Sequence, residues 1–103
     1  MKYIITEEQN VRLKALRRID ALNDLVDLRL KQPFTFDICR YGDNGDWFLY
    51  HIISWTNEQM YYDYFSDIDD DTEEWEKIWN IYADYITITH SKKIFDFYKR
   101  KCG

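Results

Sequence analysis

The stretch WFLYHIISW, Trp47–Trp55, decides which fold the sequence predicts. It is apolar on both faces, and turn-forming residues precede and follow it. A short apolar run with such flanks is typical of a central strand that is covered on each side. We therefore expect a strand at 47–55 in the middle of a sheet.

A second strand is predicted before this run. Phe34, Phe36 and Ile38 alternate with more polar residues, which is the pattern of a half-buried strand. The segment GDNGD, 42–46, connects the two strands as a turn, because Gly and Asn tolerate positive φ.

A third strand is predicted after the central run. The segment QMYYDYF, 59–65, is rich in Tyr and Phe, which favour strands, and residues 56–58 form the turn before it. Thr56 and Gln59 would also cap a short helix, so that alternative stays open. Together the three strands form an antiparallel meander.

A long helix, 7–31, is predicted before the sheet. Thr6 is a suitable N-cap, and Gln9 lies three residues later, as a capping box requires. Pro33 ends the helix, since the residue before proline avoids the helical region. At 1.5 Å per residue the helix would be ~37 Å long and would span the domain. Its apolar stripe consists of Val11, Ala15, Ile19, Leu22, Val26 and Leu30.

Two more helices and a short strand complete the predicted order. Thr72 is the natural N-cap of the second helix. Its apolar face is Trp75, Ile78, Trp79 and Tyr82. YITITH, 85–90, alternates Ile with Thr and predicts a short strand. Ser91 caps a last helix, 91–103, which has basic residues near its end, where the helix dipole favours them. The inward residues of that helix are Ile94, Phe95 and Tyr98.

The sequence therefore predicts a single α+β domain, 1–103. Hydrophobic residues make up 46% of it, enough for a core without metal or disulfide. Cys39 and Cys102 are far apart and unaccompanied, so we expect two free thiols in a reducing cytoplasm. The opening residues contain no apolar run long enough for a signal peptide, and no stretch approaches a membrane span.

Negative charge is concentrated in SDIDDDTEEWEKIW, Ser66–Trp79. Seven of the ten residues from 67 to 76 are carboxylates. Residues 41–90 have a net charge of −11, whereas 1–40 and 91–103 have net charges of +2 and +4. An acidic middle between basic ends either balances itself within the fold or attracts a basic partner.

Part of this charge is explained by a helix start, because Glu73 and Glu74 follow the predicted cap and favour the helix dipole. The four acids of 67–71 are not explained in this way, and they repel one another. An EF-hand loop does not explain them either. Counted from Asp67, the required Gly and Glu positions hold Thr72 and Ile78.

No catalytic signature accompanies the acids. His51 and His90 stand alone, and a single histidine in a packed strand is more often structural than catalytic. There is no nucleophile motif and no phosphate-binding glycine pattern. We expect no enzyme, no catalytic residue, no cofactor and no metal site. A hydrolase that uses acidic residues and a divalent ion is a third class, which metal-dependent thermal stabilisation would reveal.

Basic clusters lie at both ends of the chain, at Lys14, Arg17 and Arg18 and again at 99–101. A pI near 4.9 argues against direct nucleic-acid binding, since such domains are usually basic. We expect contact with neither nucleic acid nor membrane.

A dense carboxylate row beside aromatic rings can imitate nucleic acid, which carries one negative charge per ~1.7 Å of duplex axis. We expect a small acidic binding module that docks on a basic protein surface and inhibits it. The partner would be a nucleic-acid-processing enzyme such as a host defence nuclease. Charge would set the association rate and the rings the residence time. The predicted partner-binding residues are Asp67, Asp69, Asp70, Asp71, Glu73, Glu74, Tyr61, Tyr62 and Tyr64.

The alternative is a structural or assembly protein of a virion that self-associates through its long first helix. Leu13 and Leu28 lie off the apolar stripe of that helix and offer a second contact face. The first hypothesis predicts a monomer, and the second predicts a homo-oligomer.

The opening MKYIITEEQ, Met1–Gln9, resembles the start of many small bacteriophage-encoded proteins. Those begin with a short apolar lead, then Thr-Glu-x-Gln and a long helix. The resemblance covers nine residues of 103 and carries over no active-site residue. It implies a phage accessory or host-takeover protein in the bacterial cytoplasm. Such proteins resemble anti-CRISPR and other nuclease-inhibitor proteins in size and charge.

Overall fold

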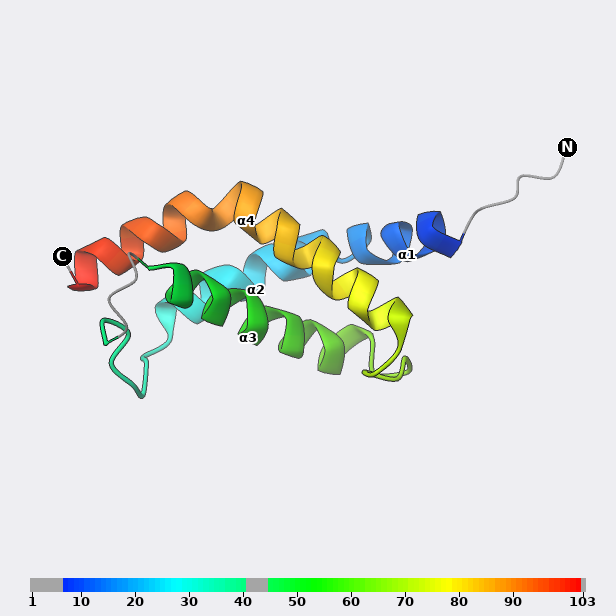
Figure 1. Ribbon diagram of the computed structural model, residues 1–103, viewed down its shortest axis with the longest axis horizontal. Coiled ribbons are helices and arrows are strands. Elements are labelled where there is room, and N and C mark those ends of the chain that lie inside the picture. The colour runs from blue at the N-terminus through cyan, green and yellow to red at the C-terminus, as the bar shows by residue number, and fades with distance from the viewer. Residues whose placement is uncertain (1–6, 41–44, 103) are drawn as a thin grey trace, which may run out of the picture.

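The computed structural model describes residues 7–40 and 45–102, and that part of the chain contains helices and no strand. The helices are α1 (Glu7–Leu16), α2 (Ile19–Lys31), α3 (Asp46–Tyr64) and α4 (Glu73–Cys102) (Figure 1). The predicted α+β class, with its meander and short strand, is therefore wrong. The predicted N-cap Thr6 and residues 42–44 of the predicted turn lie outside the described residues.

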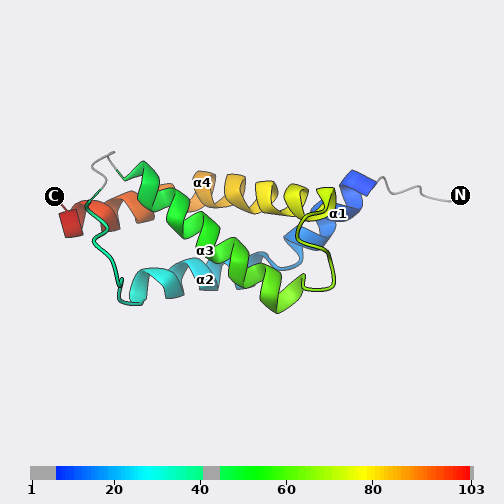
Figure 2. The same ribbon diagram turned by 60° about the horizontal axis from the view of Figure 1, so that its bottom comes forward.

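The helices form an elongated bundle. α1 and α2 follow one another along it, α3 returns in the opposite direction, and α4 runs back beside α3 (Figures 1 and 2). α1 packs on α4, and α2 packs mainly on α3. One hydrophobic core draws residues from all four helices. None of the described helices is long and apolar enough to cross a membrane.

The stretch 47–55 lies in α3 because its buried positions recur at helical spacing. Phe48, Ile52, Thr56 and Met60 are all fully buried, and they lie four residues apart on one face. The polar Thr56 interrupts this face in the sequence, so residues 56–58 resemble a turn. The predicted strands 47–55 and 59–65 are therefore wrong, because one helix, α3, runs through both segments as far as Tyr64.

Residues 34–38 form part of the connection between α2 and α3 and are not a strand. Ile38 is buried, Phe34 is half-buried and Phe36 is exposed, so the predicted alternation does not hold. With 47–55 helical, this segment has no neighbouring strand to pair with in the described chain. It packs instead through rings, with Phe34 edge-on to Phe48 at a centroid distance of 5.3 Å.

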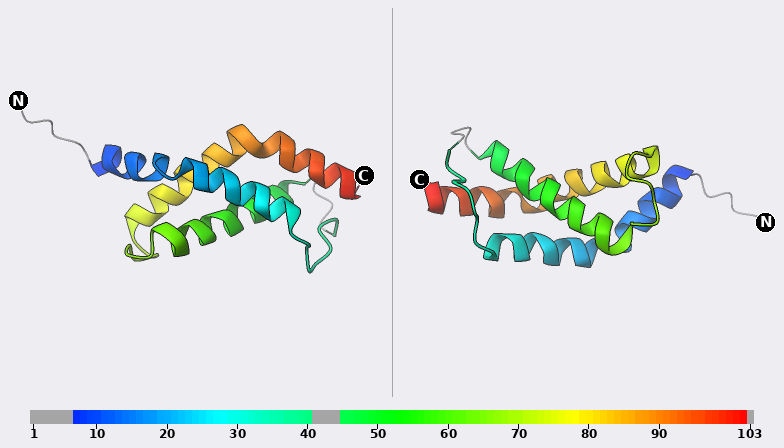
Figure 3. Two further views of the ribbon diagram at one scale, coloured as in Figure 1. Left: turned by 180° about the vertical axis from the view of Figure 1, so that it is seen from behind. Right: turned by 90° about the horizontal axis from the view of Figure 1, so that it is seen from below.

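The predicted helix 7–31 is broken at Arg17 and Arg18, as the right panel of Figure 3 shows. In an unbroken α-helix the carbonyl of Ala15 would accept the N–H of residue 19. Here that buried carbonyl accepts the Tyr82 hydroxyl at 2.7 Å and the Arg18 N–H at 3.2 Å. The break thus follows from a tertiary hydrogen bond. The apolar stripe survives it: Val11, Ala15, Leu22 and Val26 are buried, and Ile19 and Leu30 are half-buried.

The predicted strand 85–90 lies in the middle of α4. Ile86 is fully buried while Ile88 is 80% exposed, which a strand with both on one face would not allow. The Thr87 and Thr89 hydroxyls donate to the carbonyls four residues earlier, at 2.8 and 2.6 Å. Such back-bonding bends helices, and α4 bends near its middle (Figure 1). Ser91 begins no new helix, and the predicted second and last helices are one.

Other local predictions are confirmed. The Thr72 hydroxyl accepts the Trp75 N–H at 3.4 Å, as an N-cap does. Gly45 has a φ of +95°, the left-handed conformation predicted for the turn at 42–46. A Cβ at Gly45 would also approach a Phe95 ring carbon to 3.0 Å. The glycine therefore permits both the entry into α3 and the contact with α4.

A disulfide joins Cys39 to Cys102, across a sequence separation of 63 residues. The two Cα atoms are 5.4 Å apart, within the usual range for such a bond. The prediction of two free thiols is wrong, because the α2–α3 connection returns to the end of α4. Disulfides are rare in a reducing cytoplasm, and the predicted cytoplasmic location stays a prediction.

Candidate functional site

The predicted partner-binding carboxylates gather at the connection between α3 and α4. We call Asp67, Asp69, Asp70 and Asp71 the acidic loop; all four are exposed. Phe65 is buried and Ile68 is half-buried, and the Ile68 N–H donates to the Phe65 carbonyl at 3.0 Å. These apolar residues hold the connection against the bundle, so its carboxylates face outward.

The three predicted aromatic anchors differ in their availability. Tyr61 is half-buried, and its hydroxyl donates to the Ile68 carbonyl at 2.6 Å, so it fixes the acidic loop. Burial, and then the negative charges of Asp70 and Asp69, raise the pKa of Tyr61. The exposed Tyr64 ring already carries the Arg18 guanidinium 4.6 Å from its centroid. Tyr62, 62% exposed, is the most accessible of the three rings.

Glu73 and Glu74 form ion pairs within the protein. Glu74 accepts from the Lys14 ammonium at 2.8 Å, which joins α1 to α4, and Glu73 lies 3.5 Å from Lys77. In the described part of the chain no ion pair involves the acidic loop. Lys14 and Lys77 therefore neutralise the two glutamates of the predicted site, and the acidic loop forms no ion pair with the described residues.

Asp67 nevertheless faces some of those bases. It lines a depression of about 380 Å³ with Lys14, Arg17, Arg18 and Tyr64. The three remaining loop carboxylates, 69–71, are the part of the predicted row that is left for a partner.

A second depression opens beside them, which we call the tryptophan hollow. Its volume is about 300 Å³. Its lining residues are Asp70, Asp71, Thr72, Trp75, Glu76, Trp79 and Asn80. Carboxylates and indole rings both attract a lysine or arginine side chain, the rings through their π faces. Sequence spacing predicted the Trp75 and Trp79 face, but only as core.

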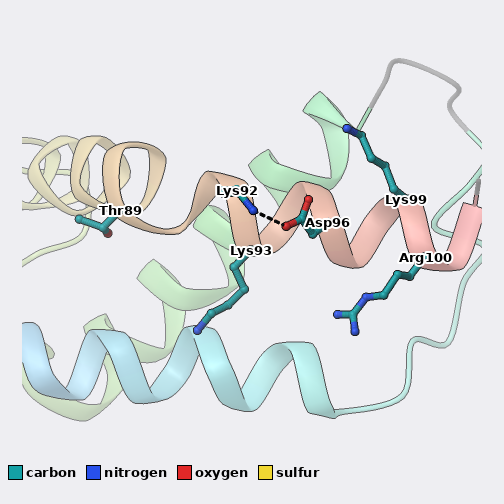
Figure 4. A pocket seen from close by; sticks show the side chains of 6 residues that line it. All are labelled: Thr89, Lys92, Lys93, Asp96, Lys99 and Arg100. Carbon is teal, nitrogen blue, oxygen red and sulfur yellow. Dashed lines mark hydrogen bonds and ion pairs between the residues drawn. The ribbon is translucent and has the colours of Figure 1, made fainter.

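The basic residues of α4 line a shallow groove at the other end of the bundle (Figure 4). This basic groove has a volume of about 810 Å³. Its lining residues are Thr89, Lys92, Lys93, Asp96, Lys99 and Arg100. They recur every three or four residues, so they share one face of the helix.

Two of the four cations in the groove have acidic partners. Lys92 donates to Asp96 at 3.0 Å, and Lys93 donates to Asp27 on α2. The Lys93 hydrogen bond lowers the pKa of Asp27. For Lys99 and Arg100 the described residues provide no ion pair, and the groove keeps a net positive charge.

Sequence reasoning missed a buried cation in the bundle. Arg29 is only 7% exposed, and its Nε has no hydrogen-bond partner in the described structure. Its guanidinium lies 4.0 Å from the Phe34 ring centroid and 5.6 Å from that of Trp55. Burial lowers the pKa of Arg29. The sequence offered one signal for its burial: Arg29 lies three residues after Val26, on the apolar stripe of the helix that ends at Lys31.

Both histidines are engaged by other side chains. The Arg29 guanidinium donates to His51 Nε2 at 3.3 Å, and burial followed by the Arg29 charge lowers the pKa of His51. His90 Nε2 lies 2.7 Å from the Asn23 side-chain oxygen, and burial lowers its pKa as well. Among the described residues no three His, Cys, Asp or Glu side chains form a metal-binding group.

Comparison with known proteins identified no relative of this chain. No protein-family model matches the chain. No curated protein is significantly similar to it, and no solved structure matches it. The described residues form a small helical bundle with the acidic loop near one end and the basic groove near the other.

Proposed function

We propose that this protein is a non-enzymatic binding module that docks its α3–α4 end on a basic surface of a larger protein and inhibits it. The observation that carries the proposal is the tryptophan hollow beside carboxylates that have no internal partner. The class of partner that fits is a nucleic-acid-processing enzyme, such as a host defence nuclease, because its phosphate-binding surface is rich in Lys and Arg.

The hollow supports the proposal through its mixed lining. Asp70, Asp71 and Glu76 supply negative charge at its rim, and the half-buried Trp79 supplies aromatic surface, whereas Trp75 is only 8% exposed. An arginine side chain combines a cation with a planar face that stacks on indole. Such a site would bind one guanidinium or ammonium group of the partner, and the acidic loop would attract its neighbours.

Inhibition follows from competition for the same surface. The consecutive carboxylates 69–71 place three negative charges close together, as successive phosphates of a nucleic-acid strand do. A cationic groove occupied by these residues cannot hold a phosphate chain. The exposed Tyr62 ring lies one helical turn before the acidic loop and adds apolar contact area.

The test is capture of partners from a bacterial lysate with three matched baits. Wild type is compared with D69N/D70N/D71N and with D24N/E58N/D84N, which removes the same number of exposed carboxylates from the helices. A true partner is retained by wild type and the helix variant and is lost from the loop variant. Added salt should weaken its capture, since the contact is electrostatic.

The captured enzyme is then purified and assayed on its nucleic acid. Wild type should inhibit it, and the loop variant should need a concentration at least about tenfold higher, a loss of about 1.4 kcal/mol. Equal capture by all three baits in low salt would refute the proposal.

Exposed leucines favour a second candidate, a structural or assembly role. Leu13, Leu16 and Leu28 are each nearly half-exposed. The break at 17–18 assigns them to two helices, so they no longer share the long helix on which this alternative was predicted. Light scattering over a range of concentrations tests it. A salt-resistant oligomer that L13S/L28S abolishes would support an assembly role.

A further inference from the structure

We infer that the basic groove of α4 is a docking site for the acidic loop of a second copy, so that copies associate head to tail. This inference rests on the proposed function, since both use the acidic loop as the binding surface, and it replaces the monomer expected of a binding module with a salt-sensitive association. That surface belongs to the chain itself.

The two surfaces lie too far apart to meet within one molecule. The acidic loop precedes the first turn of α4, and the groove lies along its last turns (Figures 1 and 4). From Glu73 to Asp96 the helix extends about 35 Å at 1.5 Å per residue. The acidic loop of one molecule can therefore reach only the basic groove of another molecule.

Part of this charge distribution has a simpler cause. Acids at the start of α4 and bases in its last turn both favour the helix dipole. That effect fades within one turn of each end. It explains Lys99 and Arg100, but it does not explain Lys92, nor the acids that precede the helix.

The cations of the groove are available for an external carboxylate. Lys99 and Arg100 form no ion pair with the described residues. The Lys92 side chain is 92% exposed, and its pair with Asp96 joins residues four apart on the helix surface. Pairs of this kind on an exposed helix surface contribute little to stability, so Lys92 can exchange its partner at little cost.

The shapes of the acidic loop and the basic groove are complementary, as their charges are. The acidic loop is the turn between α3 and α4, near the end of the bundle where α1 begins (Figure 1), and the groove is a shallow depression along the last turns of α4 (Figure 4). An exposed turn that carries three carboxylates can enter a depression lined by four cations. The reverse contact, a groove cation in the tryptophan hollow, would add an aromatic component.

The two complementary surfaces differ, so the contact has no two-fold symmetry. Contacts of this kind form rings or open chains and do not stop at a dimer. In low salt, the average mass of wild type should therefore rise continuously with concentration. In ~1 M salt, where the Debye length is about 3 Å, it should return towards the 12.7 kDa of a monomer.

Sedimentation velocity on two charge-reversal variants tests the contact. D69K/D70K/D71K makes the loop basic, and K92E/K99E/R100E makes the groove acidic. Each variant alone presents like charges at both surfaces and should remain a monomer. An equimolar mixture restores opposite charges and should recover the wild-type increase in mass.

A matched control separates this contact from the effect of net charge. D24K/E58K/D84K changes net charge as much as the loop variant does, but on exposed helix positions. It keeps both the acidic loop and the basic groove, so on its own it should show the wild-type increase in mass, whereas the loop variant of equal net charge should not. Circular dichroism confirms that each variant is folded, and a variant that is not folded is replaced by its double-substituted form.

Three results would overturn the inference. They are a wild type that stays monomeric in low salt, a D24K/E58K/D84K variant that stays monomeric as the loop variant does, and a labelled single-stranded oligonucleotide that binds wild type but not K92E/K99E/R100E. The third would assign the groove to a phosphate chain.

If wild type is monomeric while the lysate baits still differ, the inference fails and the proposed function stands. If the mixture recovers the increase while the baits capture equally, only the external partner is refuted.

Discussion

Arg29 lies buried among aromatic rings, and no carboxylate of the described residues balances its charge. A buried cation without a counter-ion is costly, and the Phe34 ring and His51 Nε2 offset part of that cost. Because Nε2 accepts a hydrogen bond from the guanidinium, the His51 ring must be neutral, with its proton on Nδ1. Protonation would place a second cation beside the first.

This pair predicts a loss of stability on acidification. The pKa of His51 is lowered from 6.5 in the folded protein, so below about pH 6.5 the unfolded chain binds more protons than the folded chain. The free energy of unfolding should therefore fall as the pH falls from 6.5 towards the folded pKa. The loss of the Lys93–Asp27 interaction comes in a separate, lower window, because the pKa of Asp27 is lowered from 3.8.

Thermal unfolding between pH 7 and pH 5 measures the effect. His51→Gln should show a smaller decrease in melting temperature than wild type over this range. His90→Gln removes a second contribution of the same sign, since burial lowers that pKa too. If His51→Gln lost as much stability as wild type, the neutral His51 would not be the cause.

At the scale of elements, two helices are shaped by single hydroxyl groups. The Tyr82 hydroxyl occupies the Ala15 carbonyl where α1 would have continued into α2, and threonine hydroxyls bond to carbonyls where α4 bends. The Tyr82 hydroxyl takes a carbonyl that an unbroken helix would pair with residue 19, whereas the threonine hydroxyls add a bond to carbonyls inside α4.

Tyr82→Phe tests the first of these contacts. It removes the buried hydroxyl bond to Ala15 and keeps the ring, so the free energy of unfolding should fall by about 1 kcal/mol. Urea denaturation measures it. Tyr50→Phe is the matched control, because Tyr50 is exposed, and a change within about 0.5 kcal/mol is expected there. Equal effects in both variants would contradict the role given to Tyr82.

At the scale of the whole molecule, the disulfide fixes the α2–α3 connection to the end of α4. Closing a loop of 63 residues restricts the unfolded chain, and the entropy model gives a stabilisation of about 4 kcal/mol. Reduction should lower the free energy of unfolding by an amount of that order. Cys39→Ser should match reduced wild type, and a reducing agent should leave this variant unchanged. An unchanged wild type after reduction would contradict the prediction.

Within the candidate site, the sequence identified what is local. The carboxylates 67–71 are neighbours in the chain, and Thr72 begins α4 as expected. The division of the acids between internal and external partners was not predictable. Lys14 meets Glu74 across 60 residues, and only the packing of α1 on α4 brings them together.

The sequence by itself determined the charge distribution, the apolar stripe of 7–31 and the N-cap at Thr72, because each depends on residues close together in the chain. The tertiary structure decided that 47–65 and 85–90 are helical, that α1 ends at Leu16, and that the cysteines meet. An apolar run indicates that a segment is buried, but it does not show whether the segment is a strand or a helix. Packing of the helices against one another decided this: the polar Thr56 is fully buried, and the apolar Ile88 is 80% exposed.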